Sequence, residues 1–221
     1  MSDKQPKLIF GWKQKLALSA LAVMVLIVVV FFVLGLIGEH RERTSPSFDS
    51  SIENTTASAW TQQEFEKNKH TISWFRDLWL SSSNFDTYSS YENVFQSADV
   101  YPDHKLDDIF SWRPYHENRG LEWLATRATG SLKARAVVVV ESYNPGVVTA
   151  VDDLIDANSS HFPTHGIVRL WSGRTEPSSQ SRVLVFHFEK TRYIDGIRIV
   201  LDTSLVDGWN CIDAIGLVRA E

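Results

Sequence analysis

The chain has very little cysteine and none of the common catalytic motifs. Its single cysteine, Cys211, excludes an intrachain disulfide. Because no His or Lys stands beside it to lower the pKa of its thiol, we expect a small buried residue rather than a reactive one. The sequence also contains no G-x-S-x-G, H-E-x-x-H, P-loop or G-x-G-x-x-G. We therefore expect a protein that is not an enzyme and needs no cofactor.

Charge is absent from one long segment, residues 16–38, which consists mostly of Leu, Ile, Val and Phe. A helix of this length rises roughly 34 Å, enough to cross a hydrocarbon core of about 30 Å. A cleaved signal peptide would have a shorter apolar region and a small-x-small site, whereas this run leads directly into charged residues. We therefore predict an uncleaved single-pass transmembrane helix.

The charges around this segment predict its orientation. More basic residues precede it than follow it, which places the tail, residues 1–15, in the cytoplasm and the C-terminal part outside. Since a secreted animal domain of this size would more often contain disulfides, a bacterial inner membrane facing the periplasm is favoured. The whole chain has a net charge of −5 although its first 38 residues are basic, so the outer part is acidic. That charge argues against nucleic acid or anionic lipid as a ligand.

Residues 39–76 are predicted to connect the membrane to a folded domain. Residues 44–59 are rich in Ser and Thr, as in a flexible spacer. Thr61 and Glu64 match a capping box, and the apolar residues that follow recur near helical spacing. We therefore predict a stalk helix over 62–76 that packs on the domain, with a partner-binding helix as the alternative.

Residues 77–221 alternate short apolar runs with turn residues, and no long amphipathic helix separates them. Residues 136–140 (AVVVV) are apolar on both faces, so their strand should be central. Pro145 and Gly146 suit a type II turn. Together these features predict an all-β fold, an antiparallel two-sheet jelly-roll sandwich. Its strands are expected near 77–83, 121–128, 134–143, 147–153, 166–172, 182–189, 194–202 and 211–219.

Four stretches in this order carry a resemblance to a known family: 97–102 (SADVYP), 121–124 (LEWL), 140–146 (VESYNPG), and 201–204 (LDTS) with 209–217 (WNCIDAIGL). Residues 78–219 thereby resemble the discoidin-like, galactose-binding-type β-sandwich domain of pappalysin-like proteins, certain F-box leucine-rich-repeat proteins and bacterial envelope proteins. The resemblance implies the sandwich fold and a tendency to bind ligands at loops on one end, but no reaction. Relatives often carry an acidic residue where Cys211 stands.

The strongest ligand-binding candidates lie in residues 110–116 (FSWRPYH). Trp112 and Tyr115 could stack on the C–H faces of a sugar, and Arg113 could hydrogen-bond hydroxyls or a carboxylate. Trp171 and Arg174 are candidates to flank the same site. The alternative is that these aromatic residues simply close one end of the sandwich.

Metal binding has weaker support in the sequence. His161 and His165 have the spacing of helical metal ligands, but Pro163 breaks such a helix, so we expect loop histidines and no metal site. A calcium site remains an open alternative for four carboxylates without a motif spacing, Asp99, Asp103, Asp107 and Asp108. Asp213, inside an apolar strand, is expected to be a hydrogen-bonded structural carboxylate.

Two functional hypotheses follow. The first is a membrane-anchored, non-catalytic binding module that recognises a glycan or another envelope component. The second is an accessory subunit that docks onto a larger membrane protein complex and binds no small ligand. A glycan binder needs exposed aromatic side chains in a concave site, whereas a subunit needs a broad apolar patch, expected to include Trp60, Phe65 or Trp74.

Overall fold

The computed structural model describes residues 55–76, 78–83, 97–106, 111–155, 157 and 166–220. They belong to the second of two compact units, residues 49–221. The predicted transmembrane helix, residues 16–38, lies outside the described residues, as do His161, His165, Asp107 and Asp108. Within the described ranges, none of the helices has the length and apolarity that a membrane crossing requires.

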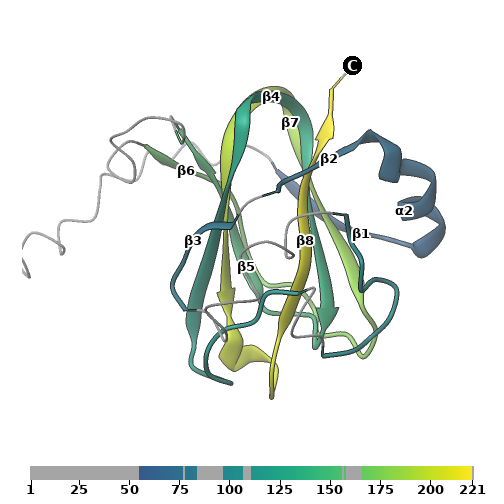
Figure 1. Ribbon diagram of the computed structural model, residues 1–221, viewed down its shortest axis with the longest axis vertical. Helices are drawn as coiled ribbons and strands as arrows, with labels where there is room; N and C mark the ends of the chain where they lie inside the picture. The colour runs from purple at the N-terminus through teal and green to yellow at the C-terminus, as the bar shows by residue number, and fades with distance from the viewer. Residues whose placement is uncertain are drawn as a thin grey trace, which may run out of the picture. The chain divides into compact units, whose positions relative to one another are not determined.

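The described part of the chain is built almost entirely from antiparallel strands (Figure 1). One short helix, α2, and two single 3-10 turns, η1 and η2, interrupt them. The strands are β1 (Thr56–Trp60), β2 (Ile72–Trp74), β3 (Leu78–Ser81), β4 (Leu121–Tyr143), β5 (Val148–Leu154), β6 (Ile167–Ser172), β7 (Arg182–Asp202) and β8 (Cys211–Arg219). The helical elements are α2 (Gln62–Asn68), η1 (Lys69–Thr71) and η2 (Thr203–Leu205).

The two long strands, β4 and β7, pair with each other along most of their length and arch over one end of the molecule (Figure 1). Residues 121–127 of β4 and 196–202 of β7 form a first layer with β3, β5 and β6. Residues 136–143 of β4 and 182–187 of β7 form a second layer with β1, β2 and β8. The predicted all-β antiparallel sandwich is therefore confirmed, with four of its eight predicted strands joined into two.

The main hydrophobic core lies between the layers. It includes Leu124 and Ile199 from the first layer and Val137, Val139 and Phe186 from the second, all almost completely buried. Burying one side chain of this size stabilises the folded state by roughly 1.5–3 kcal/mol. This burial is the main force that holds the two layers together.

A second apolar cluster covers the outer face of the second layer. Val138 and Val140 of β4 belong to this cluster together with Phe65 of α2, and Tyr101 packs against it. Successive residues of a strand point to opposite faces, so a strand that is apolar at every position must be covered on both sides. The prediction that residues 136–140 are central and buried on both faces is confirmed.

The predicted stalk helix is correct at its start and wrong at its end. The capping box is present, with the Glu64 N–H donating to Thr61 Oγ1 and the Thr61 N–H donating to Glu64 Oε2. The helix ends at Asn68, however, and Ile72–Trp74 form β2, antiparallel to β8. The spacing of the apolar residues in this segment is compatible with a helix or with a short strand after a turn. The pairing of residues 72–74 with β8 stabilises the strand.

The folded part of the chain also begins before the predicted boundary at residue 77. Residues 56–60, predicted as flexible spacer, form β1 and pair with β7 from Thr56 opposite His187 to Trp60 opposite Val183. Small and polar residues form this strand because the ladder to β7 supplies backbone hydrogen bonds that composition does not reveal. The sandwich therefore includes residues on both sides of α2.

Candidate functional site

The first predicted ligand contact, Trp112, is part of the main core. Its side chain is 1% exposed. Its backbone bridges to the start of β8, with the Trp112 N–H donating to the Ile212 carbonyl at 2.7 Å and the Ile212 N–H donating to the Trp112 carbonyl at 2.9 Å. The neighbouring Arg113 is 6% exposed, and its guanidinium lies 4.7 Å from the ring centroid of Trp209. Both side chains are therefore occupied inside the protein.

The other predicted contacts have different surroundings. Tyr115 is 53% exposed and meets His116 edge to face, while its N–H donates to Ser83 Oγ beyond β3. Trp171, on the edge strand β6, packs against Phe186 with ring centroids 4.9 Å apart. Arg174 is exposed in the loop after β6.

These five residues lie on two sides of the sandwich. In the first layer β3 and β6 are opposite edges, and β8 lies on the β3 side of β4 in the second. Trp112, Arg113 and Tyr115 therefore lie on the β3 side, and Trp171 and Arg174 on the β6 side. Ligand binding by these residues stays a prediction, and the fold does not unite them in one site.

The loops at the end opposite the arch are braced by their own hydrogen bonds. The Asn144 amide donates to the carbonyls of Asp207 and Trp209, and the Asn210 amide donates back to the Asn144 carbonyl. In the nearby loop Gly146 has the predicted positive φ, +121°, a conformation that favours glycine. Its N–H donates to the buried Glu141, which pairs with Arg182. These hydrogen bonds and this ion pair hold the described loops of this end together.

A different surface combines aromatic and polar side chains around Trp74. This residue ends β2, the last strand on its side of the second layer. Trp74 pairs with Gly216 of β8, and a Cβ at that glycine would lie 2.8 Å from Trp74 Cε3. Because glycine has no such atom, the indole can lie directly against the strand.

Trp74 belongs to an aromatic cluster on the outer face of the second layer. Its ring centroid is 6.3 Å from that of buried Phe65, which meets Tyr101 edge to face at 5.1 Å. These separations fall in the range in which aromatic pairs attract each other. Phe65 thus supports two half-buried rings whose remaining surface faces outward.

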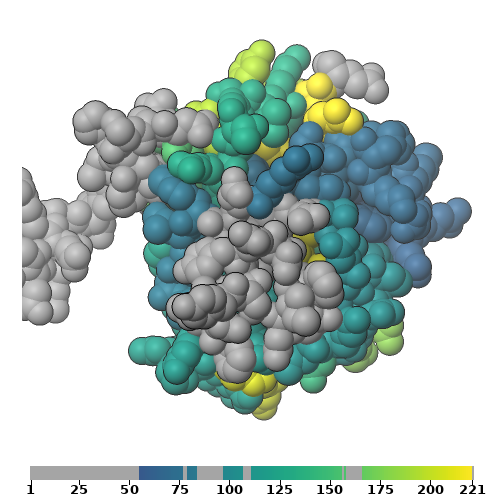
Figure 2. Space-filling model, in the orientation of Figure 1, coloured from purple at the N-terminus to yellow at the C-terminus, as the bar shows by residue number. Residues whose placement is uncertain are grey.

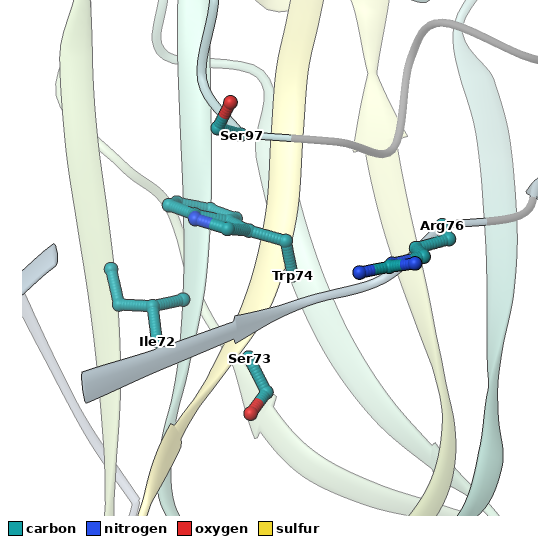
Figure 3. A pocket seen from close by; sticks show the side chains of 5 residues that line it. All are labelled: Ile72, Ser73, Trp74, Arg76 and Ser97. Carbon is teal, nitrogen blue, oxygen red and sulfur yellow. The ribbon is translucent and has the colours of Figure 1, made fainter. Parts of the chain in front are cut away.

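Two hollows flank the indole. One, of about 580 Å³, is lined by Ile72, Ser73, Trp74, Arg76 and Ser97 (Figure 3). Figure 3 shows Trp74 at its centre, with Ser97 on one side and the Arg76 side chain directed toward the indole. The other, of about 500 Å³, adds Glu66, Lys69, His70 and Tyr101. We call this surface the Trp74 site. Part of its wall comes from residues 55–76, which form one side of the molecule in Figure 2.

A buried carboxylate holds the other wall of the Trp74 site. Asp213 of β8 accepts hydrogen bonds from the backbone N–H groups of Asp99, Val100 and Tyr101, the last at 2.8 Å. Burial raises the pKa of Asp213 to about 6, although the three N–H groups favour its ionised form. Asp213 is therefore the structural carboxylate that the sequence predicts, and it fixes the segment that carries Ser97 and Tyr101.

Sequence reasoning missed this site because it assigned Trp74 to the stalk helix. The available signal was the alternation of Ile72, Ser73 and Trp74, which is the period of a strand. Three residues are too few to distinguish that period from a helical one. The partners of Trp74 also come from residues about 30 and 140 positions away, so no local pattern contains them.

Metal ligation has no assembled site in the described residues. Among them no three His, Cys, Asp or Glu side chains stand close enough to hold one ion. Of the carboxylates considered for calcium, Asp99 accepts a hydrogen bond from the Ser97 hydroxyl, and Asp103 lies 3.9 Å from the Lys105 ammonium. Cys211 is buried and has no disulfide, as the sequence predicts.

Comparison with known proteins shows the fold. No family model matches the chain, and no curated protein matches its sequence. In the crystal structure of reduced XRCC1 bound to the DNA polymerase β catalytic domain, one chain is 14% identical with a TM-score of 0.50, over 68% of this chain and 99% of that chain. At that identity the likeness shows a shared β-sandwich and nothing about ligands.

Two structures from Clostridium perfringens are similar at lower TM-scores. The CBM32-1 and CBM32-2 domains of ZmpB are 8% identical, with 78% of this chain and 43% of that chain covered and a TM-score of 0.48. The family 32 CBM of NanJ in complex with galactose is 9% identical, with 73% and 98% covered and a TM-score of 0.44. The strand pairing, together with the likeness to the XRCC1 structure, defines the fold class as an antiparallel β-sandwich.

Proposed function

We propose that this chain is a membrane-anchored, non-catalytic binding module of the galactose-binding-like jelly-roll type, which recognises a glycan or another envelope component outside the membrane. The observation that carries the proposal is the Trp74 site, where a half-buried indole lies between two hollows with polar walls. Their volumes fall in the range of about 300–1,000 Å³ that is usual for small-ligand sites.

The chemistry of the Trp74 site suits a sugar. An indole face can stack on the C–H surface of a pyranose ring, which requires an aromatic group that is supported from below and open above. Phe65 provides the support. Around the ring, the Arg76 guanidinium can donate hydrogen bonds to a ligand, and the Ser97 hydroxyl, whose proton goes to Asp99, can accept one. Hydroxyl groups of a sugar need both kinds of partner.

The membrane anchor gives such a module its location. Residues 16–38 would hold the sandwich near the outer surface of the membrane through the spacer that precedes β1. Tethering raises the effective concentration of a weak binder at its target without adding a contact. A shallow site with few direct contacts is therefore adequate for a protein attached to the surface that it recognises.

A glycan array probed with the full-length protein in mild detergent tests this function. We expect binding to a restricted set of glycans, and a loss of at least about fivefold in Trp74→Ala, because stacking on one aromatic face contributes about 1 kcal/mol beyond the area that it buries. Tyr193→Ala is the matched control, since Tyr193 is an exposed aromatic residue on β7 at the arch. Absence of binding to any glycan, or an equal loss in both variants, contradicts the proposal.

The patch that the accessory-subunit alternative predicted around Trp60, Phe65 and Trp74 is small, because Phe65 is buried and both tryptophans are half-buried. An observation on the other layer favours that alternative. The first layer instead exposes Leu121 (74%) and Leu80 (39%) on β4 and β3. Purification of the full-length protein from mild detergent separates the hypotheses: stoichiometric partners that Leu121→Asp removes and Trp74→Ala retains would establish a subunit.

A further inference from the structure

A separate hollow lies between η1, β4 and β8, on the arch side of the second layer. It has a volume of about 380 Å³ and is lined by His70, Thr71, Arg135, Arg219 and Ala220. Two of these residues are arginines, and no carboxylate is among the described residues that line it. We call it the arginine pocket.

Arg219 is held in position by the backbone of η1. Its Nη2 donates to the His70 carbonyl at 2.9 Å, and its Nε lies 3.4 Å from the Thr71 carbonyl as a second, weaker donor. Both acceptors are neutral, so these bonds orient the guanidinium without cancelling its charge. A guanidinium fixed in this way loses little further side-chain entropy when it binds an anion.

Arg135 reaches the same hollow from the neighbouring strand. In the pairing with β8, Ala134 lies opposite Arg219, and a bulge follows between Ala134 and Ala136. The bulge takes Arg135 out of the regular alternation. Its side chain is exposed, and among the described residues it has neither a salt bridge nor a hydrogen bond. Burial and the nearby Arg135 charge together lower the pKa of His187 on β7.

We infer that the arginine pocket binds a phosphate-type oxyanion between Arg135 and Arg219. A guanidinium presents parallel N–H groups that match two oxygens of a phosphate, and two guanidinium groups without an acidic neighbour favour a doubly charged anion over a neutral sugar. The Thr71 hydroxyl donates to the Asn68 carbonyl, so the arginines supply the main free donors of the pocket. The site is distinct from the Trp74 site, although His70 borders both.

The pocket lies beside the first strand of the described residues, β1. Thr56, His187, Ala136, Val218 and Ile72 lie in one row across the second layer, directly beside Arg135 and Arg219. The chain thus enters the sandwich at the level of the pocket. If the proposed anchor tethers the sandwich to a membrane, the oxyanion is either a phospholipid headgroup or a soluble phosphate.

Calorimetric titration of the full-length protein, in uncharged detergent, with inorganic phosphate tests the site. We expect saturable binding that weakens at least about tenfold in Arg135→Gln and weakens as salt increases. Arg119→Gln is the matched control, because Arg119 is an exposed arginine just before β4, away from the arch. Trp74→Ala should leave phosphate binding unchanged, which separates this site from the proposed glycan function. No saturable binding, or an equal loss in both arginine variants, overturns the inference.

A second arm identifies the source of the phosphate. Hydrogen exchange of the protein in nanodiscs of phosphatidylcholine, with or without phosphatidylglycerol, should show protection of residues 69–71 and 133–136 only with the anionic lipid if a headgroup fills the pocket. If inorganic phosphate protects these residues and the anionic lipid does not, the ligand is soluble. Protection by neither, or protection that persists in Arg135→Gln, counts against the site.

Discussion

The two layers of the sandwich differ in what covers their outer faces. The second layer is covered by α2 and the segment around Tyr101, which bury Val138 and Val140 from outside. On the first layer, described residues leave Leu121 mostly exposed, and fully buried Asp152 is paired with two partly exposed arginines, Arg169 and Arg198. The covered layer carries both proposed ligand sites, so the elements added to the sandwich are also those that shape its pockets.

The two halves of β4 differ in which of their faces are buried. From 136 to 140 every residue is apolar and buried, because other parts of the protein cover both faces of the strand. Near Leu121 buried and more exposed residues alternate, because only one face is covered. A carboxylate at position 138 would lie in the apolar second cluster, whose members carry no counter-charge. In the first layer, two arginines compensate the charge of buried Asp152. Arg198 Nη2 lies 2.6 Å from Asp152 Oδ2, and Arg169 Nε pairs with Asp152 Oδ1.

The largest expected difference between the two faces comes from adding a charge to each. Val138→Asp places an unpaired carboxylate beneath α2, and we expect a loss of more than about 4 kcal/mol or failure to fold. Leu121→Asp, on the same strand but exposed, should change stability by less than about 0.5 kcal/mol. Guanidinium denaturation of both variants measures this. Similar losses would show that the first layer is covered as completely as the second.

A smaller effect concerns pH and the segment held by Asp213. Its pKa is raised in the folded protein, from 3.8 to about 6, so the folded state binds a proton more tightly than the unfolded state between these values. The unfolding free energy contributed by this group therefore falls as pH rises from about 4 to about 6, by up to about 3 kcal/mol.

Denaturation curves of the wild type and Asp213→Asn across this range provide the measurement. The stability of the wild type relative to Asp213→Asn should decrease between pH 4 and pH 6 and then level off, because the amide does not titrate. A difference that stays constant with pH would show that Asp213 is ionised throughout the range.

The smallest expected effect is at the start of α2. Thr61→Ala removes the side-chain oxygen that caps the helix, and should cost about 1 kcal/mol. Gln63→Ala, at an exposed position of the same helix, should be nearly neutral. If Thr61→Ala also weakens binding at the Trp74 site, α2 positions Phe65 under the indole; unchanged binding would show that β2 holds the indole without the helix.

Much of the fold could be predicted from the sequence because strands, turns and caps leave local patterns. The eight predicted strands all correspond to strand residues, and the Thr61 cap, the positive φ of Gly146 and the buried Asp213 occur as expected. The merging of strands in β4 and β7 could not be predicted, because exposed residues at the arch resemble those of a loop. The extent of α2 and the existence of β1 depend on pairing with β8 and β7, which the local sequence does not contain.

The candidate site was less predictable for the same reason. Trp112 and Trp74 each follow a serine in the sequence. Trp112 nevertheless belongs to the core, whereas Trp74 borders two hollows. The acidic composition of the outer part argued against nucleic acid or anionic lipid as a ligand, whereas the fold places Arg135 and Arg219 in one pocket without an acid among the described residues that line it. Net charge averages over the chain, and a ligand responds only to the charges near it.

The sequence by itself determined most of the extended segments, though not β1 and β2, and that a long uncharged segment precedes the sandwich. These features depend on backbone preferences and on the spacing of apolar residues, which are local properties. Only the tertiary structure decided which aromatic rings stay open and where arginines meet. Burial and electrostatic potential at a point depend on every residue nearby in space, and in this protein those residues come from opposite ends of the chain.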